Sequence, residues 1–259
     1  GLGVNEARLL LASKELVGTN EQWAELTGRF GGNGLALKVV GERIRELFGG
    51  EIGLYIEEAG AGSVFGGIRQ LLAEQVERSS SPEQQVLRVL AVVREPVPLA
   101  DLLSVWGERL GRGAVLEAVE ALRRRSLVDS AEAAAFTLQS AVLEYVTDRL
   151  VEEVADEIER GQPVLLVEQP LIHAQARDYV RQSQERLIGV PIFERLRARH
   201  GEHGTEQQLL ALLEGWRGRP AAEQGYGPGN VVNLLRLLRG DLKRLDLSRL
   251  ALRQAYLAE

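Results

Sequence analysis

The sequence predicts a mainly α-helical fold that carries one small β-hairpin and ends in a five-residue repeat. Most of the 259 residues show apolar positions three or four apart, bounded by glycine, proline or a capping residue, which is typical of short amphipathic helices. The apolar spacing changes to two between residues 127 and 138, as in a hairpin. At the C-terminal end leucine recurs every five residues, at Leu242, Leu247, Leu252 and Leu257. That spacing fits neither a helix nor a strand, so a different structure is expected there.

Residues 1–60 are predicted to form a helical domain. Three helices are expected, over residues 5–16, 20–30 and 34–48, each starting where Asn5, Asn20 or Asn33 can act as an N-cap. The third helix carries an apolar stripe that should face a core, at Leu37, Val40, Ile44 and Leu47. Residues 61–67, in the glycine-rich stretch 59–67, are predicted to be a linker.

Residues 68–150 are predicted to form a winged-helix domain. Helices are expected over residues 68–78, 81–93, 99–106 and 113–125, and Ser81 followed by Pro82 is a typical start for the second of them. The hairpin pairs residues 127–128 with residues 136–138. Helices followed by a hairpin give the element order of a winged helix.

Residues 151–239 are predicted to be a helical connector, and residues 240–259 the start of the repeat. The first connector helix begins early, so that helices are expected over 140–160, 170–188, 191–199, 206–217 and 230–238. The last segment resembles pentapeptide-repeat proteins, which implies that the four leucines point inward together with Gly240, Leu245, Leu250 and Ala255. So few units cannot form an independent solenoid, so we expect them to pack on the preceding helices.

Composition excludes several classes of protein. The net charge of −6 and the isoelectric point near 5.4 argue against non-specific coating of nucleic acid or anionic membrane. The absence of cysteine excludes disulfides and a cysteine nucleophile, and no apolar run is long enough to span a membrane. A cytoplasmic protein is therefore expected. The absence of methionine indicates that these residues are a piece of a longer chain.

No catalytic or metal site is predicted. The glycines around Asn33 match neither a phosphate loop nor a dinucleotide turn, because they follow a helix and Lys38 is followed by Val39. His200 and His203 have the spacing of a metal pair but lack a third ligand. His173 stands alone, and packing or surface exposure is its expected role.

The basic cluster Arg123, Arg124 and Arg125 has two interpretations. A winged helix can place its third helix in the DNA major groove, where these cations would contact phosphate. The same helix, however, carries Glu117 and Glu120 where base-reading groups would lie. Because cations at a helix C-terminus also complement the helix dipole, the structural role is favoured.

The chain resembles the region that follows the nucleotide-binding core in bacterial signal-transducing NTPases of the STAND class, NB-ARC type. The resemblance is carried by segments 32–40, 44–50, 122–128, 136–139, 173–180 and 247–257. It implies nucleotide contacts at Gly32, Asn33 and Gly34, and at Gln139. Gly34 stands where the family has proline, and Gln139 where it has histidine.

The resemblance implies a regulatory and oligomerisation segment that couples a sensor domain to nucleotide-dependent assembly, in signalling or an immune-like conflict response. Walker A and Walker B motifs are absent, so no enzymatic activity and no cofactor are expected in these residues, whereas the whole protein is expected to be an ATP/ADP switch. The expected partners are a second copy, a P-loop domain and a C-terminal WD40 or pentapeptide sensor, without membrane or nucleic acid. The helix around residues 39–48 is expected to lie exposed and to drive self-association. The alternatives are a DNA-binding winged-helix regulator and a helical scaffold without a switch.

Overall fold

The computed structural model describes residues 1–58 and 68–257, apart from the side chains of residues 68 and 105–110. These residues form two compact units. The first unit comprises residues 1–87 and 96–145, and the second comprises residues 88–95 and 146–259. The predicted linker 61–67 lies outside the described residues. The mainly α fold and the small β-hairpin are confirmed.

The first unit begins with a group of short helices. They are α1 (Val4–Leu10), the 3-10 turn η1 (Ala12–Lys14), α2 (Asn20–Arg29), α3 (Gly34–Phe48) and α4 (Ile52–Glu58). Helix α3 has the predicted bounds and the predicted Asn33 cap. Helix α2 is capped by Thr19 instead of Asn20, because the Thr19 hydroxyl accepts from the Gln22 amide while Gln22 bonds back to the Thr19 amide. Helix α4 was not predicted.

The apolar stripe of α3 lies inside the core of this group. Leu37, Val40 and Ile44 are fully buried, and so is most of Val39. Leu47 is the exception, with 59% of its surface exposed. Most of the apolar stripe is therefore not exposed as expected, since α1, α4 and the later helix α5 (Ile68–Glu77) contact α3. Self-association stays a prediction.

The rest of the first unit has the element order expected of a winged helix. Its elements are α5 (Ile68–Glu77), α6 (Ser81–Val93), β1 (Val97–Pro98), α7 (Leu99–Leu110), α8 (Arg112–Arg124), β2 (Val128–Ala131) and β3 (Ala135–Leu138). The antiparallel sheet has the order β1-β3-β2. Strand β1 was missed because it is two residues long and contains Pro98, which the sheet tolerates at its edge.

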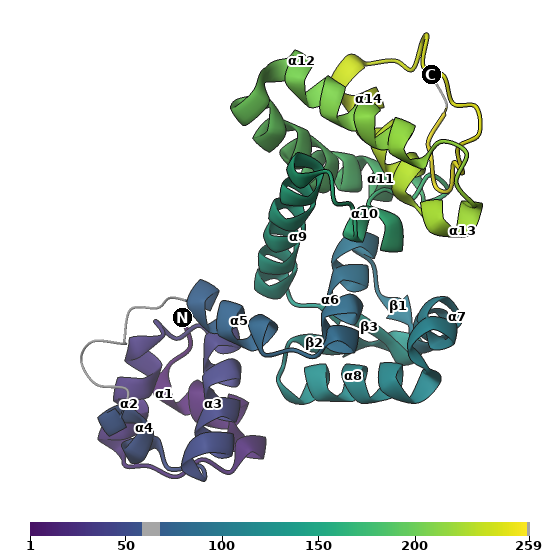
Figure 1. The fold of residues 1–259 in the computed structure, drawn as a ribbon. Helices are drawn as coiled ribbons and strands as arrows, with labels where there is room; N and C mark the ends of the chain where they lie inside the picture. The colour runs from purple at the N-terminus through teal and green to yellow at the C-terminus, as the bar shows by residue number, and fades with distance from the viewer. Residues whose placement is uncertain (59–67, 258–259) are drawn as a thin grey trace. The chain divides into compact units, whose positions relative to one another are not determined.

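The second unit is an array of helices (Figure 1). It contains the end of α6, α9 (Ser140–Arg160, from residue 146), α10 (Leu165–Glu168), α11 (Asp178–Gln184), the π-helical turn η3 (Glu185–Gly189), α12 (Val190–Trp216), α13 (Ala221–Gln224) and α14 (Gly227–Arg239). The predicted helix 170–188 begins only at Asp178. The label α12 covers the two helices predicted over 191–199 and 206–217, since the backbone between them is not helical at Gly201, with φ 69° and ψ 175°.

Residues 240–257 form neither helix nor strand but an ordered coil with a five-residue period, which we call the pentad coil. Its backbone enters the left-handed region at Arg244, Arg249 and Gln254, with φ of 62°, 57° and 56°. The carboxylates of Asp241 and Asp246 accept from the amides two residues ahead, each at 2.9 Å. The five-residue pattern of the sequence is thus a five-residue pattern of the backbone.

Candidate functional site

The predicted nucleotide-contacting residues Gly32, Asn33 and Gly34 form the joint between α2 and α3. The Asn33 side chain accepts from the amides of Leu35 and Ala36 at 3.1 and 3.0 Å. The amide of Gly32 donates to the Thr27 carbonyl at 2.9 Å, with Gly32 in the left-handed region at φ +66°. These hydrogen bonds cap the two helices. The Asn33 side chain caps the start of α3, and the Gly32 amide pairs with a carbonyl near the end of α2.

The side of Gly34 that a larger residue would occupy faces apolar side chains. A Cβ atom built on Gly34 would lie 3.4 Å from Leu2 and 3.5 Å from Leu10. The Leu2 amide also donates to the Gly32 carbonyl at 2.8 Å. In this arrangement the N-terminal residues cover the joint, and the nucleotide contact inferred from the resemblance stays a prediction.

Gln139 follows β3 and bonds within the hairpin. Its side-chain amide donates to the Asp129 carboxylate of β2 at 3.2 Å. Among the described residues no hydrogen bond joins Gln139 to residues 32–34. The nucleotide contact inferred for Gln139 therefore also stays a prediction.

The basic cluster at the end of α8 is divided in its roles. Arg123 and Arg124 are exposed, whereas the Arg125 guanidinium lies 2.7 Å from the Glu83 carboxylate of α6, with only 15% of the Arg125 side chain exposed. Arg125 also donates to the Gln75 carbonyl and the Ser79 hydroxyl at 3.3 and 3.4 Å. One of the three arginines thus joins α8 to α5 and α6 and is not available to a phosphate.

The exposed face of α8 carries mixed charge. Glu117 and Glu120 are exposed, as is Leu116 with 45% of its surface. Carboxylates at these positions repel phosphate.

The histidines assemble no metal site. Within residues 1–58 and 68–257, no group of three or more candidate ligands could hold a metal ion. His200 Nε2 lies 3.3 Å from Glu159 and His203 bonds to Gln207. His173 lies in the irregular segment before α11 and not on a helix, and its burial lowers the pKa of the imidazole.

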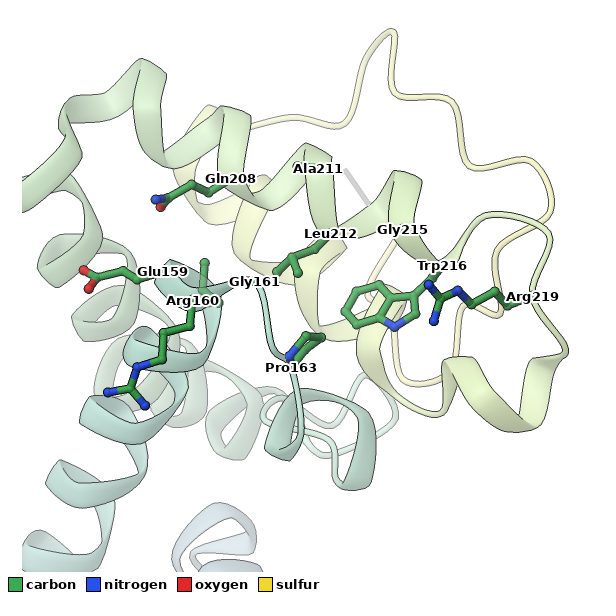
Figure 2. A pocket seen from close by; sticks show the side chains of 11 residues that line it. Glu159, Arg160, Gly161, Pro163, Gln208, Ala211, Leu212, Gly215, Trp216 and Arg219 are labelled. Atoms are coloured by element: carbon green, nitrogen blue, oxygen red, sulfur yellow. The ribbon is translucent and has the colours of Figure 1, made fainter.

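An open groove of about 440 Å³ lies in the second unit between the end of α9 and the second half of α12. Figure 2 shows Trp216, Leu212 and Pro163 around it, with Gln208 at one end. The Gln208 Oε1 atom is buried without a partner among the described residues. The residues that line the groove do not include a nucleophile beside a base, which is the arrangement that a site for nucleophilic catalysis needs.

The pentad coil is attached to the second unit first by its apolar side chains. Those that pack against the core of this unit are Leu242, Leu245, Leu247, Leu250, Leu252 and Ala255. Leu257, also predicted to point inward, is instead 53% exposed. Figure 1 shows the coil in yellow beside the helices α13 and α14. The expectation that the five-residue leucines pack on the preceding helices is confirmed for Leu242, Leu247 and Leu252.

Polar side chains of the helices hold the backbone of the coil. Arg217 donates to the carbonyls of Ser248 and Asp246 at 2.6 and 3.0 Å. The Gln224 carbonyl accepts from the Ala251 amide at 2.6 Å. These contacts satisfy backbone groups that a coil without regular structure would otherwise leave unpaired.

The end of the coil is held at Tyr256. Asn233, on the buried face of α14, accepts from the Tyr256 amide at 2.8 Å and donates to the Gln254 carbonyl at 2.9 Å. The Tyr256 ring lies against the guanidinium groups of Arg181 and Arg236, at 3.8 and 5.0 Å from its centroid. Both distances are in the range of cation–π attraction.

These polar residues were not singled out from the sequence. A signal for one of them exists, because Asn233 stands inside the apolar run of residues 231–235. An amide on the core face of a helix needs a buried partner, so its position alone indicated an irregular segment packed against it. Nothing local indicated Arg181 or Arg236, whose partner is 75 and 20 residues away by numbering.

No protein-family model and no solved structure matches the chain. Among curated proteins, an uncharacterized WD repeat-containing protein from Nostoc sp. strain PCC 7120 is 34% identical over 293 aligned positions. The alignment includes 99% of this chain and 23% of that protein. The chain is therefore similar to a limited part of a longer, WD repeat-containing protein. In the part of the chain that the structure describes, no helix is long and apolar enough to cross a membrane.

Proposed function

We propose that these residues are the regulatory part of a signal-transducing ATPase of the STAND class. The helical group and the winged-helix elements close on nucleotide held by a P-loop domain elsewhere in the longer protein. The second unit and its pentad coil connect that switch to a WD-repeat sensor, and exchange of ADP for ATP promotes assembly of several copies.

The observation that carries this proposal is the docking of the pentad coil on the second unit. A connector must pass a change at its end to its body, and a coil fixed by core leucines and by Arg217, Gln224 and Asn233 can do so. The WD repeats named in the similar Nostoc protein supply the kind of sensor that such a connector serves.

The winged-helix elements support a role in protein contact. Arg125 is engaged by Glu83, and the exposed face of α8 presents Glu117 and Glu120. Nothing in the described residues favours the alternative of a DNA-binding regulator. A gel shift with duplex DNA is therefore expected to show no retardation that depends on Arg123 and Arg124.

The decisive experiment uses the longer protein that contains these residues. Purified protein is incubated with Mg·ATP or Mg·ADP, and its mass is measured by light scattering. We expect a larger assembly with ATP than with ADP, and equal masses with both nucleotides would contradict the proposal.

A substitution in the coil tests whether the connector participates. Leu247→Asp places a charge against the core of the second unit and is expected to abolish the nucleotide-dependent difference in mass. The matched control is Leu257→Asp in the exposed part of the same coil, which should leave the difference intact. For residues 1–259 alone, calorimetry is expected to show no micromolar affinity for ADP and no ATP hydrolysis.

A further inference from the structure

Tyr256, Arg181, Arg236 and Glu185 form one group of contacts in the second unit, which we call the clasp. Arg181 and Arg236 both donate to Glu185 Oε1, from Arg181 at 3.0 Å, so that one carboxylate joins the two guanidinium groups that flank the ring. Glu185 and Arg181 are almost inaccessible, with 14% and 9% of their side chains exposed. A buried ion pair keeps its geometry, because separating the two groups would leave an unpaired charge away from water.

Glu185 is also the first residue of the π-helical turn η3. Such turns are uncommon and are often found where a helix has a functional role. At the end of this turn Gly189 lets α14 approach closely, since a Cβ atom there would lie 2.6 Å from Leu237. The turn therefore contacts α14 at both of its ends, through Glu185 to Arg236 and through Gly189 to Leu237.

Gln184, which precedes η3, extends the contact to helix α6. Its side chain is fully buried, donates to the Val92 carbonyl at 2.8 Å and accepts from the His173 amide at 2.8 Å. Val92 lies at the end of α6 and belongs to the core of the second unit. Gln184 and Glu185 are adjacent, so a shift of the turn moves both sets of bonds.

We propose that the clasp of Tyr256, Arg181, Arg236 and Glu185 and the amide of Gln184 form a relay that couples the end of the pentad coil to the end of helix α6. With the tyrosine ring in place, Glu185 holds η3 and Gln184 holds the Val92 carbonyl. When the ring leaves, the paired arginines lose one face of their packing, and the turn and α6 open together. The buried Nε of Arg236 has no partner among the described residues, which leaves it a donor to use in a second arrangement.

The relay differs from general loosening of the second unit, and hydrogen exchange distinguishes the two. In residues 1–259, Tyr256→Ala is expected to speed the exchange of α6 amides 89–93 by about fivefold or more, the lower range of measured couplings between sites. Tyr256→Phe keeps the ring and should exchange as the parent does. Amides 150–158 of α9 should be unaffected.

The matched control is Leu250→Ala, which weakens the apolar attachment of the same coil without touching the clasp. In this variant the amides of residues 89–93 should not exchange faster than other amides of the second unit. Unchanged exchange of these amides in Tyr256→Ala, or equal acceleration in Leu250→Ala, would overturn the relay.

Coupling between two sites is reciprocal, and this supplies a second measurement. Gln184→Ala removes the bond to Val92 and is expected to speed exchange of the Tyr256 amide, which is protected by Asn233. An unchanged Tyr256 amide in this variant also contradicts the proposal. Neither measurement involves nucleotide, so the relay and the proposed function fail independently.

Discussion

In the first unit, Asn33 closes the joint between α2 and α3 by bonding to amides two and three residues away, whereas in the second unit Asn230 bonds to backbone groups 59 to 64 residues away. Both are asparagines that satisfy backbone groups outside regular structure. The first does so at the surface, where water can replace it. The second is 2% exposed, so its partners have no substitute.

Further buried amides repeat the second arrangement. Gln184 links segments 92 residues apart, and Asn233 and Gln224 hold the pentad coil. The irregular segments of the second unit are thus part of its core, because the amides satisfy backbone that would otherwise be buried unpaired. Loops that are merely exposed would not need such residues. The comparison predicts that substitutions of long-range amides cost more than substitutions of local caps.

The largest effect is expected for Asn230→Leu. This change keeps the size of the side chain but leaves the Leu171 amide and the carbonyls of Leu166 and Gln169 without partners, which should cost at least about 3 kcal/mol. Native-state hydrogen exchange of α14 amides measures the free energy of opening of the second unit. Gln182→Leu, at an exposed amide of α11, is the control and should change it little. If the two variants lowered the free energy of opening equally, buried side-chain amides with distant partners would not differ from exposed ones.

The next effect concerns two glycines of the same unit. A Cβ atom on Gly229 would lie 1.9 Å from the Arg253 carbonyl, so Gly229→Ala is expected to push the pentad coil off α14 and to speed exchange of the Tyr256 amide. Gly215, in α12, has nothing within 4 Å of the corresponding position. Gly215→Ala should instead stabilise the second unit, by about 0.5–1 kcal/mol. If Gly229→Ala stabilised the second unit as Gly215→Ala does, the pentad coil would not be packed closely on Gly229.

A smaller effect is expected for the local cap. Asn33→Ala removes two bonds to the amides of Leu35 and Ala36 and should cost about 1 kcal/mol, the usual value for a cap. Asn33→Ser retains an acceptor and should recover most of the loss. Urea unfolding followed by circular dichroism measures both. A cost for Asn33→Ala as large as that for Asn230→Leu would show that the cap is not a local feature.

The same distinction explains which features could be predicted from the sequence. The Asn33 cap, the bounds of α3 and α9, and the hairpin follow from neighbouring residues, and so does the five-residue period of the coil. The irregular segment before Asp178 was mistaken for helix, because its backbone amides bond to the side chains of Asn230 and Gln184, which lie 59 and 11 residues away. Arg125 was taken as part of a basic cluster for the same reason, since its partner Glu83 is 42 residues away by numbering. Long-range partners are invisible until the fold brings them together.

The smallest effect is a pH dependence that belongs to the long-range arrangement. Burial lowers the pKa of His173 in the folded protein, so the unfolded chain takes up the proton more readily. The stabilising contribution is present above the unfolded value of about 6.5 and is lost as pH falls through the interval below it. Between pH 7.5 and pH 5.5 the urea midpoint of the parent should fall more than that of His173→Gln. His203→Gln alters an exposed histidine and should follow the parent. If His173→Gln also follows the parent, the imidazole is not held in the buried segment that Gln184 and Asn230 fix.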